Sequence, residues 1–174
     1  MLKTITLDCD EVLYDCISYG LRLVNADYGI DAVKDWYDLG EKTQELVELF
    51  ASKDFYKFEP IYKGSQEFVS RLSQIADIYI ATALPEEYKE IRLERIKKDF
   101  PEIKLENVFF MEDKSSVNTM FFIDDAVHNI KACKAKYPIL MQRPWNKNEK
   151  DFIKAKSYNE ILKIVSTFKS ITHD

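Results

Sequence analysis

Two short strand-like stretches, each followed by a pair of acids, constrain the fold of this chain more than any other feature. Residues 3–7 alternate polar and apolar side chains, as a strand does, and lead directly into Asp8 and Asp10. A second apolar run ends directly before Asp124 and Asp125. If both runs are strands of one open α/β sheet, the acids lie beyond its carboxyl edge, where such sheets bind ligands. An acid after a strand is ordinary in a turn, but two such clusters together predict a site for a hard divalent cation.

Strands and helices alternate along most of the chain. Further strands are predicted at 77–81, 108–111, 120–123 and 139–141. Apolar residues at helical spacing predict helices at 65–75, 86–100, 129–137 and 157–168. Such alternation is typical of a mostly parallel sheet covered by helices. The expected fold is therefore α/β, with a three-layer Rossmann-like parallel sheet.

The segment after the first strand is long for a simple connection. Helical spacing predicts helices at 17–28, 31–39 and 41–52, whereas one helix usually connects two parallel strands. We therefore expect a small helical cap, residues 14–60, inserted after the first strand and lying over the sheet edge. The α/β core would then comprise residues 1–13 and 61–174.

Charge and length limit the possible partners. The 174 residues allow one compact domain with a small insertion. A formal charge of -5 argues against extended contact with long nucleic acids, although a small anionic substrate held by a metal remains possible. We find no apolar run of membrane-spanning length and no signal sequence. We expect a cytoplasmic protein without a membrane partner.

Cysteine and glycine patterns exclude several other kinds of site. Cys9, Cys16 and Cys133 are odd in number and lack metal-ligand spacing, so they predict neither a disulfide framework nor a zinc site. Cys9 lies between two carboxylates that disfavour its thiolate, and we interpret its side chain as packing. The four glycines are far apart, which excludes a glycine-rich phosphate loop.

Two further polar residues stand where an anion could bind. Thr82 ends the strand at 77–81, so its hydroxyl and the neighbouring amides could meet a phosphate at the sheet edge. Lys114 lies in the loop before the second acidic pair and could reach the same place as a point charge. Each residue alone is unremarkable in its setting, because Thr favours strands and loop lysines are mostly solvated.

The order of these residues resembles the haloacid dehalogenase superfamily of phosphohydrolases. The matching positions are Asp8-x-Asp10 with Val12-Leu13, then Thr82, then Lys114, then Asp124-Asp125. Within the superfamily the closer likeness is to the 5'(3')-deoxyribonucleotidases, through residues 8–15, 54–60 with Gly64, 80–82, 113–114 and 122–125. A helical insertion of this size at this place is also typical of that group.

Two positions depart from the pattern of these families. Glu11 stands where they usually have glycine, which adds an acid and a side chain to the first loop. Ala83-Leu84 replaces the Ser-Pro that commonly follows the Thr in the deoxyribonucleotidases. The second change removes a hydroxyl that could help hold phosphate, although the amide of Ala83 could still serve.

The resemblance implies an Mg²⁺-dependent phosphomonoesterase that acts on (deoxy)nucleoside monophosphates. Asp8 would attack phosphorus to form an aspartyl-phosphate, and Asp10 would act as general acid and base. Asp8, the main-chain carbonyl of Asp10 and Asp124 would bind Mg²⁺, with Asp125 behind them. The phosphate oxygens would be held by Thr82, Lys114 and the amides of Cys9, Asp10 and Ala83.

Substrate choice would depend on the cap, whose closure would also exclude water. An aromatic side chain there could stack on a nucleobase, and the candidates are Trp36, Tyr37 and Phe50, although core packing competes for each. Arg143 and Trp145, on the loop after the strand at 139–141, either border the site or only fix that loop. The expected assembly is a monomer or a homodimer.

Other interpretations stay open on the sequence alone. The same fold could dephosphorylate another small metabolite or, against the acidic balance, a nucleic-acid 3' end. Glu11 could mark an inactive, metal-binding relative. A phosphoacceptor signalling domain belongs to a different class; it would carry its Thr and Lys after the acceptor Asp in mid-chain, whereas Thr82 and Lys114 precede the second acidic pair here.

Overall fold

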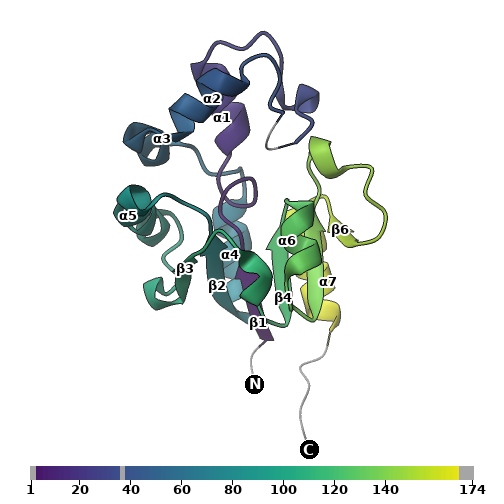
Figure 1. The fold of residues 1–174 in the computed structure, drawn as a ribbon. Helices are drawn as coiled ribbons and strands as arrows, with labels where there is room; N and C mark the ends of the chain where they lie inside the picture. The colour runs from purple at the N-terminus through teal and green to yellow at the C-terminus, as the bar shows by residue number, and fades with distance from the viewer. Residues whose placement is uncertain (1–2, 36–37, 169–174) are drawn as a thin grey trace, which may run out of the picture.

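Six parallel strands form one sheet in the computed structural model, which describes residues 3–35 and 38–168 (Figure 1). Their order across the sheet is β3-β2-β1-β4-β5-β6. The strands are β1 (Lys3–Leu7), β2 (Ala76–Thr82), β3 (Val108–Phe110), β4 (Phe121–Asp124), β5 (Tyr137–Met141) and β6 (Ile153–Ala155). This architecture confirms the predicted α/β class with a parallel sheet.

Helices cover both faces of the sheet. Phe121 and Ile123 of β4 pack in one apolar cluster, whereas Phe122 packs in another. The first cluster includes side chains of α4 (Ser65–Ser73), α5 (Lys89–Asp99) and α7 (Tyr158–Thr167), and the second includes side chains of α6 (Val127–Ala132). Because successive side chains of a strand point to opposite faces, the two clusters lie on opposite sides of the sheet. The core therefore has three layers.

The segment between β1 and α4 builds small apolar clusters of its own. Its helices are α1 (Cys16–Leu23), α2 (Thr43–Phe50) and α3 (Lys53–Phe58). One cluster joins α1 to α2 through Ile17, Leu21 and Leu46, and a second surrounds Phe55. Figure 1 shows these helices gathered beyond the end of the sheet opposite the N-terminus, which is its carboxyl edge. The assignment of residues 14–60 as a cap domain stays a prediction.

Two predicted helices of this segment are wrong in extent. The helix expected over 17–28 ends at Leu23, because Asn25 has a left-handed φ of 50° that a helix cannot continue through. The helix expected over 31–39 is reduced to a short 3₁₀ helix, Ile30–Ala32, after which Val33 is extended. Short-range apolar spacing predicted the helices, but it carries no information about where the backbone must turn.

The third prediction in this segment, a helix over 41–52, is partly correct. The helix α2 ends at Phe50, and extended Ser52 separates it from α3, which was not distinguished from the sequence.

The core contains further differences from the predicted elements. The helix expected over 129–137 is shifted and shorter, because Cys133 is already extended and Tyr137 begins β5. Edge strand β6 was not predicted, since three residues are too few to show alternation. The helix expected from residue 86 starts as a 3₁₀ turn, Glu86–Tyr88. The remaining 3₁₀ helices are Leu105–Asn107, Lys114–Ser116 and Pro144–Asn146.

None of the helices in the described part of the chain is both long and apolar enough to cross a bilayer.

We expect Ile5→Ala in central strand β1 to lower the free energy of unfolding by about 2–5 kcal/mol, because Ile5 is fully buried and its truncation leaves a cavity. The matched control is Ile153→Ala in edge strand β6, where the side chain is 40% exposed and the cost should be below about 1 kcal/mol. Urea denaturation of both variants measures the difference. Equal losses would show that the sheet centre is not the main packing region.

Candidate active site

The ends of three neighbouring strands place the first group of polar residues together. Asp8 follows β1, Thr82 ends β2 and Asp124 ends β4, and β1 lies between the other two. The amide of Asp8 donates to the carbonyl of Ile123 over 2.9 Å, which continues the pairing of β1 with β4 past the strand end. The carboxylates of Asp8, Asp124 and Asp125 lie within 4.8 Å of one another and are buried.

Lys114 supplies positive charge to this cluster. Its Nζ lies 2.8 Å from Asp8 Oδ1 and 2.8 Å from Asp124 Oδ2, in a position where the ammonium is almost wholly buried. The short 3₁₀ helix Lys114–Ser116, which precedes β4, brings it there. Although burial alone would lower the pKa of Lys114, its two carboxylate partners raise it well above the usual value. Lys114 is therefore a permanent cation at the sheet edge.

The acids outnumber this cation. Burial raises the pKa of Asp8 to about 7, Lys114 opposes that rise, and neighbouring Asp124 adds to it. Burial and then the charge of Asp124 also raise the pKa of Asp125 well above its usual range. If all three acids were ionised beside the single ammonium, negative charge would be in excess, and mutual repulsion contributes to the raised pKa values of Asp8 and Asp125. Hard oxygen ligands so close together fit a divalent cation such as Mg²⁺.

Hydrogen bonds orient the carboxylate of Asp124. Oδ1 accepts the amide of Ala126 over 2.8 Å, and Oδ2 accepts the side-chain amide of Asn129 over 3.0 Å as well as Lys114. Asn129 belongs to α6, which begins directly after the acidic pair. The turn from β4 into α6 thus holds the carboxylate in one orientation.

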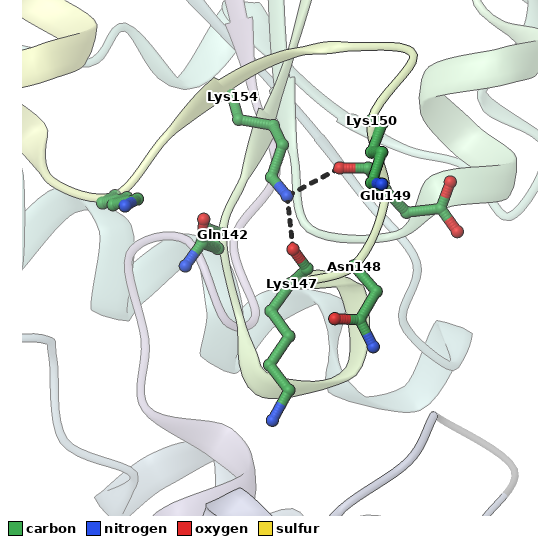
Figure 2. Close-up of a pocket in the computed structure, with 7 residues that line it drawn as sticks. Gln142, Lys147, Asn148, Glu149, Lys150 and Lys154 are labelled. Atoms are coloured by element: carbon green, nitrogen blue, oxygen red, sulfur yellow. Dashed lines mark hydrogen bonds between the residues drawn. The ribbon is translucent and has the colours of Figure 1, made fainter.

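The loop after β5 reaches back to the acids. Trp145 Nε1 donates to Asp125 Oδ2 over 3.0 Å, and Asn146 Nδ2 donates to the carbonyl of Asp125 over 2.8 Å. Farther along, Lys154 of β6 donates to the carbonyls of Lys147 and Glu149 over 2.7 and 2.8 Å. Figure 2 shows the Lys154 side chain directed at these carbonyls. Lys154 and its neighbours line a hollow of about 720 Å³. The lysine closes the loop that carries Trp145.

The proposed phosphate-binding residues lie at the same edge. Thr82 Oγ1 is buried and has no hydrogen-bond partner among the described residues, as expected of a hydroxyl kept for a ligand. Ala83 is exposed and lines a cavity of about 400 Å³. The amide of Cys9 donates to Asp8 Oδ1 over 2.7 Å, and burial raises the pKa of the Cys9 thiol far above its usual value. Cys9 therefore packs as a neutral thiol.

Asp10 has a partner that sequence patterns did not single out. Arg92 Nη2 donates to Asp10 Oδ1 over 2.7 Å, and Arg92 Nη1 lies 2.7 Å from Glu59 Oε1 as an ion pair without hydrogen-bond geometry. Arg92 and Glu59 are fully buried. A signal did exist: Arg92 lies four residues before Ile96 on the buried face of α5, where an apolar residue would be expected.

Comparison with known proteins identifies the family. A profile of the family described as "5' nucleotidase, deoxy (Pyrimidine), cytosolic type C protein" matches residues 2–171. The chain belongs to this family. It is a phosphoric monoester hydrolase with a haloacid dehalogenase-like fold, as the sequence resemblance implied. The match does not favour the phosphoacceptor domain considered from the sequence.

Individual relatives agree with this assignment. The enzyme is 28% identical over 170 residues to a 5'(3')-deoxyribonucleotidase of Bacillus subtilis (strain 168), covering 92% of this chain and 97% of the relative. It is 25% identical over 141 residues to a 5'(3')-deoxyribonucleotidase of Clostridium acetobutylicum, covering 79% and 78%.

Solved structures show the same fold. A haloacid dehalogenase-like hydrolase from Streptococcus pneumoniae has a TM-score of 0.58 at 11% identity, with 94% of this chain and 98% of the other covered. A HAD hydrolase from Bacillus subtilis bound to magnesium gives 0.58 at 16% identity, with the same coverage of 94% and 98%.

Glu11, the departure from the family pattern, is fully buried in the loop after β1. Its backbone has a left-handed φ of 60°, a conformation that glycine adopts without steric strain. The buried carboxylate accepts the amide of Ile17 over 2.7 Å and the hydroxyl of Tyr62 over 2.5 Å. Arg143 donates to the Glu11 carbonyl and lies over the ring of Tyr62. Burial raises the pKa of Glu11 to about 7, and the hydrogen bonds from Ile17 and Tyr62 oppose that rise.

The aromatic candidates of the insertion are only partly placed. Trp36 and Tyr37 lie outside the described residues. Phe50 packs on Phe55, with ring centroids 5.0 Å apart, and belongs to the apolar clusters of the insertion. For Phe50 the packing interpretation is therefore the better supported.

We expect Glu11→Ala to lower the free energy of unfolding by about 2–4 kcal/mol, since it leaves the Ile17 amide and the Tyr62 hydroxyl without their acceptor. Glu11→Gln keeps a carbonyl oxygen at this place and should cost less. Glu102→Ala removes an exposed carboxylate and serves as the matched control. Chemical denaturation measures all three variants. If Ala and Gln cost the same, the carboxylate geometry is not what stabilises this turn.

Proposed function

We propose that this enzyme hydrolyses deoxynucleoside monophosphates through an aspartyl-phosphate on Asp8, with Mg²⁺ as cofactor. The observation that carries the proposal is the buried cluster in which Lys114 lies between Asp8 and Asp124. The substrate class is supported by the names of the relatives in Bacillus subtilis and Clostridium acetobutylicum. A cytoplasmic location and the oligomeric state stay predictions.

The cofactor site would use residues that already converge. Asp8, Asp124 and the main-chain carbonyl of Asp10 would hold Mg²⁺, and Asp125 would lie behind them. Their close carboxylates fit a hard dication. When bound, the metal would neutralise charge on the phosphate and lower the repulsion between it and an attacking carboxylate.

Covalent catalysis would divide the reaction into two steps. An Asp8 carboxylate oxygen would bond to phosphorus while the bond from phosphorus to the ester oxygen breaks. Asp10 would give a proton to that ester oxygen, so that the nucleoside leaves as a neutral alcohol. Asp10 would then take a proton from the water that attacks phosphorus, which frees Asp8 and inorganic phosphate.

Other residues of the chain would hold the transferring phosphoryl group. The Lys114 ammonium and the Thr82 hydroxyl would bind its oxygens, helped by the amides of Asp10 and Ala83. The amide of Cys9 is already bonded to Asp8, so its contribution would be to orient the nucleophile.

The helical insertion would select the substrate. Residues 14–60 would act as a cap on the core formed by 1–13 and 61–174, and its closure would exclude water. Trp36 and Tyr37 remain candidates for stacking on the base. Phe50 is a weaker candidate because it packs on Phe55.

We expect Mg²⁺-dependent phosphate release from deoxynucleoside monophosphates, and Asp8→Asn should abolish it because an amide cannot serve as the nucleophile. The measurement compares deoxynucleoside and ribonucleoside monophosphates and an aryl phosphate, with and without Mg²⁺. Cleavage of the aryl phosphate alone would keep the chemistry and contradict the proposed substrate class. Full activity of Asp8→Asn would contradict the covalent mechanism.

Asp124→Asn should raise the Mg²⁺ concentration needed for half-maximal activity by about tenfold or more, because it removes one anionic ligand from the proposed metal site. Asp77→Asn is the matched control, since Asp77 is exposed near the opposite end of β2. Titration of activity with MgCl₂ measures both variants. An unchanged requirement in Asp124→Asn would remove Asp124 from the ligand set.

A further inference from the structure

We propose that Arg92 is a positioning residue for Asp10, and that Glu59 fixes Arg92 in turn. Arg92 would hold one carboxylate oxygen of Asp10 so that the other one exchanges the proton with the ester oxygen. This inference rests on the proposed function, because it assigns a role to residues around the general acid.

The first argument is the direction of the hydrogen bond that Arg92 donates to Asp10. Its guanidinium is fully buried and donates from Nη2 to Asp10 Oδ1 over 2.7 Å. The Asp10 side chain keeps 17% of its surface exposed, so the buried guanidinium does not enclose it. A planar guanidinium gives a hydrogen bond of defined direction. Because Arg92 holds Oδ1, the proposal gives the proton exchange to the other oxygen, Oδ2.

The second argument is how the guanidinium itself is held. Glu59 Oε1 lies 2.7 Å from Arg92 Nη1. The ring centroids of Tyr14 and Tyr56 lie 4.4 and 5.4 Å from Arg92 Cζ. These neighbours come from the loop after β1 and from the end of α3, whereas Arg92 comes from α5. Two segments distant in sequence from α5 therefore fix this side chain.

The third argument is charge balance in a buried place. Asp10 and Glu59 are two acids that share one guanidinium, and their nearest oxygens lie within 4.8 Å of each other. Both acids contact the guanidinium at 2.7 Å, so the buried Arg92 is not left without a partner, which would be very costly.

Arg95 offers a matched control one turn later on the same helix. It donates to the carbonyls of Tyr56, Lys57 and Glu59 at the end of α3 and pairs with Asp99. Like Arg92 it joins α5 to the insertion, but among the described residues Asp10 is not one of its hydrogen-bond or ion-pair partners. A variant of Arg95 therefore loosens α3 without removing the partner of the general acid.

The test uses two leaving groups. The nucleoside of deoxyuridine monophosphate leaves as an alkoxide unless it is protonated, whereas 4-nitrophenolate leaves easily without a proton. The ratio of kcat/KM for deoxyuridine monophosphate to kcat/KM for 4-nitrophenyl phosphate reports the need for a general acid. A general acid contributes roughly 10²–10⁴-fold.

We expect Arg92→Gln to lower this ratio about tenfold or more, as part of that contribution, and Arg95→Gln to leave it unchanged. Arg92→Lys keeps the buried positive charge, so it should fold even if Arg92→Gln does not. It should lower the ratio less than Arg92→Gln does, but it should still lower it, because an ammonium lacks the planar fork of a guanidinium. Glu59→Gln should also lower it. Thermal melting of each variant checks that it is folded.

An unchanged ratio in Arg92→Lys and Arg92→Gln, with both substrates slowed equally, would overturn the inference and leave the proposed function standing. The same fall in Arg95→Gln would also overturn it, because the effect would then come from loosening α3. Lack of turnover of both substrates by the unaltered enzyme would instead reject the proposed function, and this inference with it.

Discussion

Buried carboxylates can be gathered at one edge of a sheet only if positive charge lies among them. Here Lys114 meets Asp8 and Asp124 at 2.8 Å each, and the parallel order of β1 beside β4 brings the two acids together. Such a cluster of hard carboxylate ligands suits a metal-assisted phosphoryl transfer. A bound dication would offset the charge of the acids and of an anionic substrate.

Helix α5 links that site to the helical insertion. Its residues Arg92 and Arg95 lie one turn apart and both contact the end of α3, yet they meet different groups there. Arg95 donates hydrogen bonds to carbonyls at a helix end, which stabilises that end. Arg92 joins buried Glu59 to Asp10, which follows the proposed nucleophile by two residues. Such buried pairs add little net stability, so specificity of orientation is the better reason for their presence.

The loop after β1 shows how an unusual residue is accommodated. At Glu11 a left-handed backbone, which costs a residue with a side chain about 1–2 kcal/mol, is offset by a buried carboxylate with several partners. Tyr62 lies between α3 and α4, and Arg143 lies in the loop after β5. The extra acid therefore joins three segments. These contacts account for its side chain structurally, so its presence does not by itself argue for an inactive enzyme.

The sequence by itself determined the sheet class, the ends of its central strands and the acids that follow them, because period-two patterns and strand-ending acids are local signals. It did not determine where the helices of the insertion end, the shift of α6 or the existence of β6. The spacing of Arg92 and Ile96 hinted that Arg92 is buried, but it could not show that Arg92 meets Asp10 and Glu59, which are far from it along the chain. From sequence alone an arginine in a helix is expected to be exposed to solvent, and only the packing shows that it is buried. Only tertiary structure decides which charges lose their water, and burial is what turns an ordinary ion pair into a constraint on a catalytic group.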